Sequence, residues 1–285
     1  MEENTQSPLV VAFVADLMFT TRIANVLRHL GYRVKWVEKP ADLGGDQSPT
    51  NLVGVSEQIG GQMGQLFIKV ADWQPALLIF DLSNNDIPWE SWMPPLKSSP
   101  ATRNIPIIAY GSHMDVDVME RAKRAGADAV LARSRFTSDM PDLIEKYARV
   151  PDYDSLAATC LEPLSDLAVS GIEKFNQKQF YPCHDDLEEA WMQDKSPGRD
   201  LYQGILQVAI AYYQIERGNY RGAMKMLLRL RQRLDPLPPV CRGVNLQKLR
   251  QDVSTVQEAL VSMDEGKIED FDTSLFKPIE FAISI

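Results

Sequence analysis

The chain holds 285 residues, and because single domains usually contain about 100–150 residues, this length predicts two domains. Its 45% hydrophobic and 24% charged residues are typical of a globular protein, and no apolar run approaches the ~20 residues that cross a bilayer. The net charge of −9 argues against general attraction to nucleic acid, which requires a basic surface.

We expect a cytoplasmic protein, from the start of the chain, and, from the apolar runs and the charge, no membrane or nucleic-acid partner. The start, Met1 to Asn4, is acidic and lacks the basic flank of a secretory signal. The cysteines Cys160, Cys183 and Cys241 are far apart, odd in number and without a Cys-x-x-Cys pair. This spacing predicts neither a disulfide framework nor a zinc ribbon, so we expect core or incidental thiols.

Five apolar runs alternate with helical patterns in the first half of the chain. They are typical of strands buried on both faces of a parallel sheet, and they cover residues 9–14, 33–37, 76–81, 105–110 and 129–132. A helical pattern such as that of residues 20–30 separates each pair of runs. Regular alternation of strand and helix predicts a doubly wound α/β domain.

The segment from Leu9 to Ala148 resembles the receiver domain of two-component response regulators, the CheY-like fold. The resemblance puts Asp81, at the end of the third strand, at the phosphoacceptor position. It also places Val14 and Ala15 where receivers carry their magnesium-binding acids, with Asp16 just beyond, and Arg133 where they carry a lysine.

Two further receiver positions also differ from the family pattern. Gly111 replaces the hydroxyl residue after the fourth strand, with Ser112 adjacent, and Ser134 replaces a proline. Because Mg²⁺ is held mainly by carboxylates, one remaining acid makes a weak cation site. We therefore predict a pseudo-receiver that is not phosphorylated at Asp81, which instead ends the strand as a polar residue or pairs with Arg133.

Two loops of this half have open interpretations. Residues 39–50, rich in glycine and proline, predict a mobile surface loop. Residues 111–115 form a loop that could bind a ligand through His113 and Asp115. The favoured alternative is that Ser112 or Asp115 caps the next helix.

The second half predicts helices only. A Pro-Asp break near residue 150 separates the halves, and helical patterns follow at residues 155–177, 180–193, 199–217, 219–234 and 245–262. We assign a receiver-like domain to residues 1–149, a connector to 150–164, an all-α helical bundle to 165–263, and an acidic linker with an apolar tail to 264–285. The tail either docks in a groove or is disordered.

A repeat of period 40 relates the two central helical patterns. Its aromatic, small and leucine positions are those of tetratricopeptide-like hairpins. They recur as Phe180, Cys183 and Leu187, then Tyr220, Ala223 and Leu227.

Residues 175–191, 203–209 and 217–223 together resemble an all-helical bacterial and archaeal family, the domain of unknown function 309 family, some of whose members are labelled predicted metal-dependent hydrolases. The resemblance implies a helical fold and leaves the reaction open.

A polar cluster is the candidate site of this half. His184 and Glu188 lie at i and i+4, so they share one helical face and can place an imidazole and a carboxylate on one metal ion. The favoured alternative is a buried hydrogen-bonded network between two helices, and a small-ligand pocket is the third. The candidate members are His184, Asp185, Glu188, Trp191, Gln203 and Gln207.

Basic residues recur at every fourth position along one helix. This ladder predicts a solvated face or a surface for an acidic partner, and it consists of Arg217, Arg221, Lys225, Arg229 and Arg233.

Together these patterns predict a regulatory or scaffolding protein: a pseudo-receiver fused to a helical domain that binds a protein or ligand. Self-association or a protein partner is expected, and no cofactor. The alternative is a metal-dependent hydrolase that uses His184 and Glu188 with a divalent metal.

Overall fold

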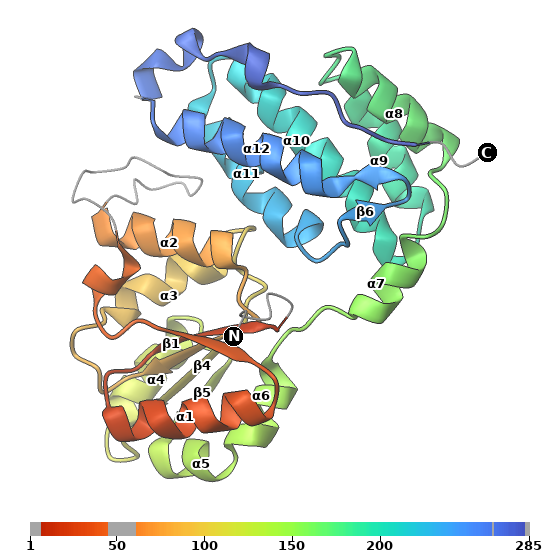
Figure 1. Ribbon diagram of the computed structural model, residues 1–285. Coiled ribbons are helices and arrows are strands. Elements are labelled where there is room, and N and C mark those ends of the chain that lie inside the picture. The colour runs from red at the N-terminus through yellow and green to blue at the C-terminus, as the bar shows by residue number, and fades with distance from the viewer. Residues whose placement is uncertain (1–6, 45–60, 264, 283–285) are drawn as a thin grey trace. The chain divides into compact units, whose positions relative to one another are not determined.

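The computed structural model describes residues 7–44, 61–263 and 265–282, and the chain forms two compact units that divide at Val150 (Figure 1). Part of the loop expected at residues 39–50, and parts of the 264–285 tail, lie outside the described residues. Among the residues that the structure describes, no helix combines the length and the apolar character needed to span a membrane.

The first unit is a five-stranded parallel sheet with the order β2-β1-β3-β4-β5. This is the doubly wound order of flavodoxin and receivers, so the predicted α/β fold is confirmed. Its strands are β1 Leu9–Phe13, β2 Arg33–Trp36, β3 Leu77–Asp81, β4 Ile107–Gly111 and β5 Ala129–Ala132. Its helices are α1 Leu17–His29, α2 Gly61–Trp73, α3 Trp89–Ser98, α4 Val116–Arg124, α5 Arg133–Ser138 and α6 Met140–Tyr147, with the short 3₁₀ helix η1 at Pro40–Leu43.

Helices cover both faces of this sheet (Figure 1). On one face, Ile23 and Leu27 of α1 and Ile144 of α6 pack with Val10 and Ile79 in a fully buried core. On the other face, Phe13 stacks on Phe80 with ring centroids 4.1 Å apart and meets Trp92 of α3 edge-on. Two buried faces explain why these strands read as continuous apolar runs.

The second unit is built from helical hairpins. Its helices are α7 Tyr153–Thr159, α8 Asp166–Asn176, α9 Cys183–Gln193, α10 Asp200–Glu216, α11 Tyr220–Leu234 and α12 Leu246–Val261, with 3₁₀ turns η2 Pro197–Arg199, η3 Glu265–Asp270 and η4 Thr273–Leu275. The repeat positions that the sequence singled out are buried in it, from Phe180, Cys183 and Leu187 to Tyr220, Ala223 and Leu227. Small residues allow close pairing: a Cβ on Gly204 of α10 would lie 2.2 Å from Leu234 of α11.

Two expectations for this half are wrong. The helix expected at residues 155–177 is two helices, because Pro163 lacks an N–H donor and Ser165 caps a new start by accepting the Ala168 N–H at 3.2 Å. The half also contains strands: β6 Val240–Cys241 and β7 Val244–Asn245 form a small antiparallel hairpin. Two-residue strands are too short to leave a periodic signal in the sequence.

The described part of the C-terminal tail lies against the helical unit. Phe276 stacks on Tyr212 of α10 with ring centroids 4.1 Å apart, and Ile279 is buried. The side chain of Asn176 both donates to the Ile279 carbonyl at 2.9 Å and accepts from its N–H at 2.7 Å. The tail is thus held by its backbone as well as by its apolar side chains.

Candidate functional site

The carboxyl edge of the parallel sheet gathers Asp16, Asp81 and Arg133. Asp81 ends β3 and is 3% exposed, Asp16 is the N-cap of α1, and Arg133 opens α5 directly after β5. The carboxyl ends of parallel strands meet at one edge, where doubly wound folds place their sites. Strand register alone therefore brings together residues that are 52 positions apart, as Asp81 and Arg133 are.

The Arg133 guanidinium bridges the two carboxylates. Its Nη2 lies 3.1 Å from Asp81 Oδ2, and its Nη1 lies 3.7 Å from Asp16 Oδ2. The other oxygen of each acid is engaged by backbone: Asp81 Oδ1 accepts the Ser83 N–H at 2.9 Å, and Asp16 Oδ1 accepts the Met18 N–H at 2.9 Å. The sequence left two alternatives for Asp81, a polar strand end or a pair with Arg133. The structure contains the pair.

The Arg133 guanidinium contacts the carboxylate oxygens with which a receiver would hold its cation. Val14, at one expected acid position, is fully buried in the core. A guanidinium already offsets the two remaining carboxylates, whereas Mg²⁺ needs several free oxygens at about 2.1 Å. Behind the pair, burial raises the pKa of Tyr110 and the nearby Asp81 carboxylate adds to the rise, so this phenol stays neutral.

A pocket of about 810 Å³ opens beside this cluster. Its lining residues come from α1, α5 and the loops after β3 and β4, and they are Arg22, Ser83, Ser112, His113, Arg133, Ser134, Thr137 and Ser138. His113, one of the two possible ligand-loop residues, lines the pocket. Asp115 stands at the N-cap position of α4 without a side-chain capping bond, while Ser112 Oγ accepts the Met114 N–H at 3.2 Å.

In the helical unit, the polar cluster expected from sequence does not assemble. His184 Nδ1 lies 3.3 Å from Asp185 Oδ1 and 3.9 Å from Glu188 Oε2, and these two carboxylates are 82% and 49% exposed. The inward face of α9 is made by Cys183, Leu187 and Ala190. His184 and Glu188 flank that face, so the prediction that they are buried is wrong.

The amides expected to complete the network lie elsewhere. Gln207 of α10 is buried and Gln203 is partly buried, and the Oε1 of each has no hydrogen-bond partner among the residues that the structure describes. The Trp191 indole N–H is also buried, with no acceptor in the described part of the chain, and Arg199 lies over the Trp191 ring at 5.2 Å. The structure therefore brings His184, Asp185 and Glu188 together, and among the described residues no hydrogen bond or ion pair joins them to Gln203, Gln207 or Trp191.

The residues present do not fit a divalent metal at His184. Zinc sites normally use three or four protein ligands at 2.0–2.3 Å. Within the described ranges, no group of three or more histidine, cysteine or acidic side chains is placed to hold an ion. One imidazole with two widely exposed carboxylates gives too few convergent donors, so we derive no reaction step through a metal here.

The inner polar contact between α8 and α9 was not predicted. Asp186 Oδ2 lies 2.6 Å from Lys174 Nζ and accepts the Ser170 hydroxyl at 2.7 Å. The Lys174 hydrogen bond, followed by that of Ser170, lowers the pKa of the Asp186 carboxyl. Asp186 rather than His184 is thus the residue of this run that joins the two helices.

The basic ladder is only partly an outward face. Arg217 and Arg221 are exposed, but Lys225, Arg229 and Arg233 are partly buried. Arg233 forms an ion pair with Asp200 of α10 at 2.9 Å. The uniform outward orientation expected from the spacing is wrong, because α11 packs against α10 and its last turn, with Arg233 and Leu234, lies against Asp200 and Gly204 of that helix.

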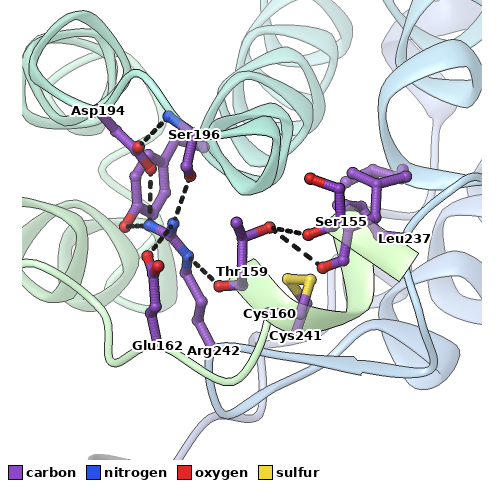
Figure 2. The surroundings of a disulfide bond; sticks show 12 residues. Ser155, Thr159, Cys160, Glu162, Asp194, Ser196, Leu237, Cys241 and Arg242 are labelled. Atoms are coloured by element: carbon purple, nitrogen blue, oxygen red, sulfur yellow. Dashed lines mark hydrogen bonds and ion pairs between the residues drawn. A yellow bond between two sulfur atoms is a disulfide. The ribbon is translucent and has the colours of Figure 1, made fainter. Parts of the chain in front are cut away.

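The main feature that sequence analysis missed is a disulfide between Cys160 and Cys241 (Figure 2). It joins the end of α7 to the β6–β7 hairpin across 81 residues of sequence. The expectation of incidental thiols is wrong for these two cysteines, because an odd total conceals a pair when the third cysteine is a core residue. Cys183 is that residue: it is a buried free thiol, and burial raises its pKa to about 12.

Next to the disulfide, the Arg242 side chain is 4% exposed and surrounded by acceptors (Figure 2). The guanidinium lies 2.8 Å from Asp194 Oδ2 and 3.1 Å from Glu162 Oε2, and it donates to Ser196 Oγ at 2.9 Å. It also donates to the Tyr202 hydroxyl and, at 3.3 Å, to the Thr159 carbonyl. One side chain thereby joins the end of α7, the loop after α9, and α10.

The backbone of Arg242 is unusual in a way that its side chain explains. Its φ is +52°, a value that non-glycine residues seldom adopt, and Gly243 follows at +81°. Two successive positive φ angles form the type I′ turn of a two-residue hairpin, where asparagine and glycine predominate. Arginine has no preference for this turn, so the buried contacts of the guanidinium compensate for the local strain.

Comparisons with known proteins agree with the two halves. Residues 169–226 match the model of a family described as a domain of unknown function (DUF309), which confirms the resemblance noted for the helical half. A search of curated proteins found no match.

Solved structures similar to this chain are response regulators aligned over its receiver-like half. The phosphorylated cyanobacterial phytochrome response regulator RcpA shares 11% identity over 51% of this chain and 99% of its own, with a TM-score of 0.38. A putative response regulator from Chloroflexus aurantiacus shares 16% identity over 50% and 97%, with a TM-score of 0.38. A receiver domain from Bermanella marisrubri shares 19% identity over 50% and 98%, with a TM-score of 0.37.

Proposed function

We propose that this chain is a regulatory or scaffolding protein whose receiver-like unit works without phosphorylation. The observation that carries the proposal is the Arg133 guanidinium placed between Asp81 and Asp16. In a phosphorylated receiver, a cation offsets the charge of the acceptor and of the incoming phosphoryl group. Here the guanidinium of Arg133 is already paired with the carboxylate of Asp81, which stands at the acceptor position. This pairing favours one permanent state of the unit.

Acetyl phosphate with Mg²⁺ is expected to leave the intact mass of the protein unchanged, because Asp81 is buried and bound to Arg133. A phosphorylatable receiver treated in parallel serves as the positive control. A gain of one phosphoryl group that disappears in Asp81→Ala would show that Asp81 is a working acceptor and would contradict the proposal.

We further propose that the first three residues of the basic ladder, the exposed Arg217 and Arg221 and the partly buried Lys225, bind an acidic surface on a protein partner. The chain as a whole is acidic, with a net charge of −9, so a concentrated basic stripe favours partners that the rest of its surface repels. Contacts of this kind are screened over about 8 Å at physiological salt.

Reversal of Arg217, Arg221 and Lys225 to glutamate is expected to abolish salt-sensitive binding of partners in pull-downs at low salt. The apolar face of α11, with Leu227 and Leu230, is not altered. The matched control reverses three exposed basic residues of the other unit, Arg28, Arg124 and Arg149. Equal recovery of partners by both triple variants would mean that the ladder is only a solvated face.

A further inference from the structure

The pocket beside Asp81 has a lining that suits an anion. Two arginines and one histidine contribute to it together with five hydroxyl groups, and none of the described residues that line it carries a carboxylate. Its volume of about 810 Å³ lies within the range of small-molecule sites, roughly 300–1,000 Å³. The lining is therefore rich in donors and lacks the acidic groups that would repel negative charge.

Most of these side-chain donors have no acceptor among the described residues. Thr137 donates to the Arg133 carbonyl, and Ser138 donates to the Arg135 carbonyl and to Asp139. In contrast, within the part of the chain that the structure describes, five lining side chains donate no hydrogen bond: Arg22, Ser83, Ser112, His113 and Ser134. Donors that converge on a pocket without an internal acceptor are available for a ligand.

The two arginines differ in their state of charge. Arg133 is largely offset by Asp81 and Asp16, as described above. Arg22, in the second turn of α1, forms no ion pair with any described residue. The uncompensated charge in the pocket is thus that of Arg22, and a guanidinium recognises phosphate oxygens through paired, charge-assisted hydrogen bonds.

Exposed apolar side chains stand next to the pocket. Met18 is 84% exposed and lies one helical turn before Arg22, on the same face of α1. Met114 is 76% exposed and directly follows the lining residue His113. Methionine is flexible and polarisable, and it makes favourable contacts with aromatic rings. These two residues offer a surface to the organic part of a ligand whose anionic part enters the pocket.

We propose that this pocket binds a small phosphomonoester with a flat or apolar organic part, such as a nucleoside monophosphate, without forming a covalent bond. Arg22 is the principal phosphate contact, the hydroxyls of Ser83, Ser112 and Ser134 complete it, and Asp81 takes no part. The proposed function assigns no ligand to this unit, so this inference adds a signal that can reach it in the absence of phosphorylation.

Calorimetric titration of the full chain with adenosine monophosphate, in EDTA and at constant ionic strength, tests the proposal. We expect saturable binding at one site, with inorganic phosphate as a weaker competitor and adenosine without effect. Arg22→Gln is expected to weaken binding about ten-fold or more, because a charged hydrogen-bonding partner is lost. Ser134→Ala is expected to weaken it by a smaller factor.

Arg28→Gln is the matched control, because Arg28 is another exposed arginine of α1 and does not line the pocket. It should bind as the unmodified protein does, and thermal unfolding of the variants should confirm their fold. Absence of binding at millimolar adenosine monophosphate would overturn the proposal, as would equal affinity in Arg22→Gln. Neither result bears on the acetyl phosphate experiment, so the two hypotheses fail separately.

Discussion

Reduction of the Cys160–Cys241 disulfide is expected to lower the free energy of unfolding of the helical unit by up to about 4 kcal/mol. The cross-link spans 81 residues of sequence, and closing a loop of that length removes much of the conformational freedom of the unfolded chain. In the folded state it holds α7, the first helix after the boundary at Val150, to the β6–β7 hairpin. Without it, that attachment depends on Arg242 and on backbone contacts.

Urea denaturation with and without a thiol-free reductant measures this effect, and the Cys160→Ser/Cys241→Ser variant should reproduce it. The receiver-like unit provides an internal control, because all three cysteines belong to the other unit. Its unfolding transition should not move when reductant is added. A two-domain chain requires the two transitions to be analysed separately.

Counting the thiols tests the disulfide directly. Alkylation in denaturant without reductant should modify only Cys183, and after reduction it should modify all three cysteines. In the folded protein Cys183 should not react at pH 8, because burial raises its pKa to about 12 and leaves almost no thiolate. Three modified thiols before reduction would show that the cross-link does not form.

The same measurement bears on the cellular environment. The sequence led us to expect a cytoplasmic protein, yet disulfides are rare in reducing compartments. Alkylation at the moment of cell lysis would trap the native state of Cys160 and Cys241. A reduced pair in the cell would mean that the disulfide adds its stability only under oxidising conditions.

The sheet was predictable because its evidence is local. Each strand of the receiver-like unit is an apolar run with turns at both ends, as in residues 76–81, and β3 indeed covers Leu77–Asp81. A parallel order then follows from the alternation with helices, and parallel order brings Asp81 to the edge where Arg133 begins α5. The Asp81–Arg133 pair could therefore be proposed from sequence as one of two alternatives.

The polar cluster of the helical half could not be predicted in the same way. An i, i+4 spacing shows that His184 and Glu188 share a face of α9, but it does not show which way that face points. Leu187 and Ala190 determine the inward direction, and His184 and Glu188 lie beside it. Non-local features leave still less signal: nothing in the spacing of Cys160 and Cys241 indicates that the helices bring them together.

Arg242 is the second such non-local feature, and its replacement is expected to have an equally large effect. Arg242→Met should destabilise the helical unit by about 3–5 kcal/mol, because removing one partner of a buried ion pair leaves the other charge uncompensated. Asp194, whose side chain is 16% exposed, is that other charge. Burial opposes its ionisation, but the hydrogen bonds from Ser196 and the Arg242 guanidinium hold its pKa below the ordinary value.

The low pKa of Asp194 makes part of this stability dependent on pH. A carboxyl whose pKa is lower in the folded than in the unfolded state stabilises the fold above its unfolded pKa of about 3.9. This contribution is lost as the pH falls below that value and through the folded pKa. In Arg242→Met the pKa of Asp194 is expected to rise, because burial still opposes its ionisation and the guanidinium is gone, so acidification should cost the variant less stability than it costs the unmodified protein.

Two variants at position 242 separate the side chain from the backbone. Arg242→Gly and Arg242→Met both lose the guanidinium, but glycine adopts the φ of +52° without strain. Arg242→Gly should therefore be the more stable of the two, by up to about 1 kcal/mol. Arg217→Met, at an exposed arginine, is the matched control and should change stability by less than about 0.5 kcal/mol.

Combining Arg242→Met with the loss of the disulfide should reveal coupling between the two links. Arg242 directly follows Cys241, and its N–H donates to the Cys160 carbonyl at 2.7 Å, so both links attach the same hairpin to the end of α7. Once α7 has separated from the hairpin, removing the second link breaks fewer remaining contacts. The double variant should therefore lose less free energy of unfolding than the sum of the losses of the single variants. Urea midpoints of the four proteins give this difference, and strict additivity would mean that the disulfide and Arg242 stabilise separate parts of the unit.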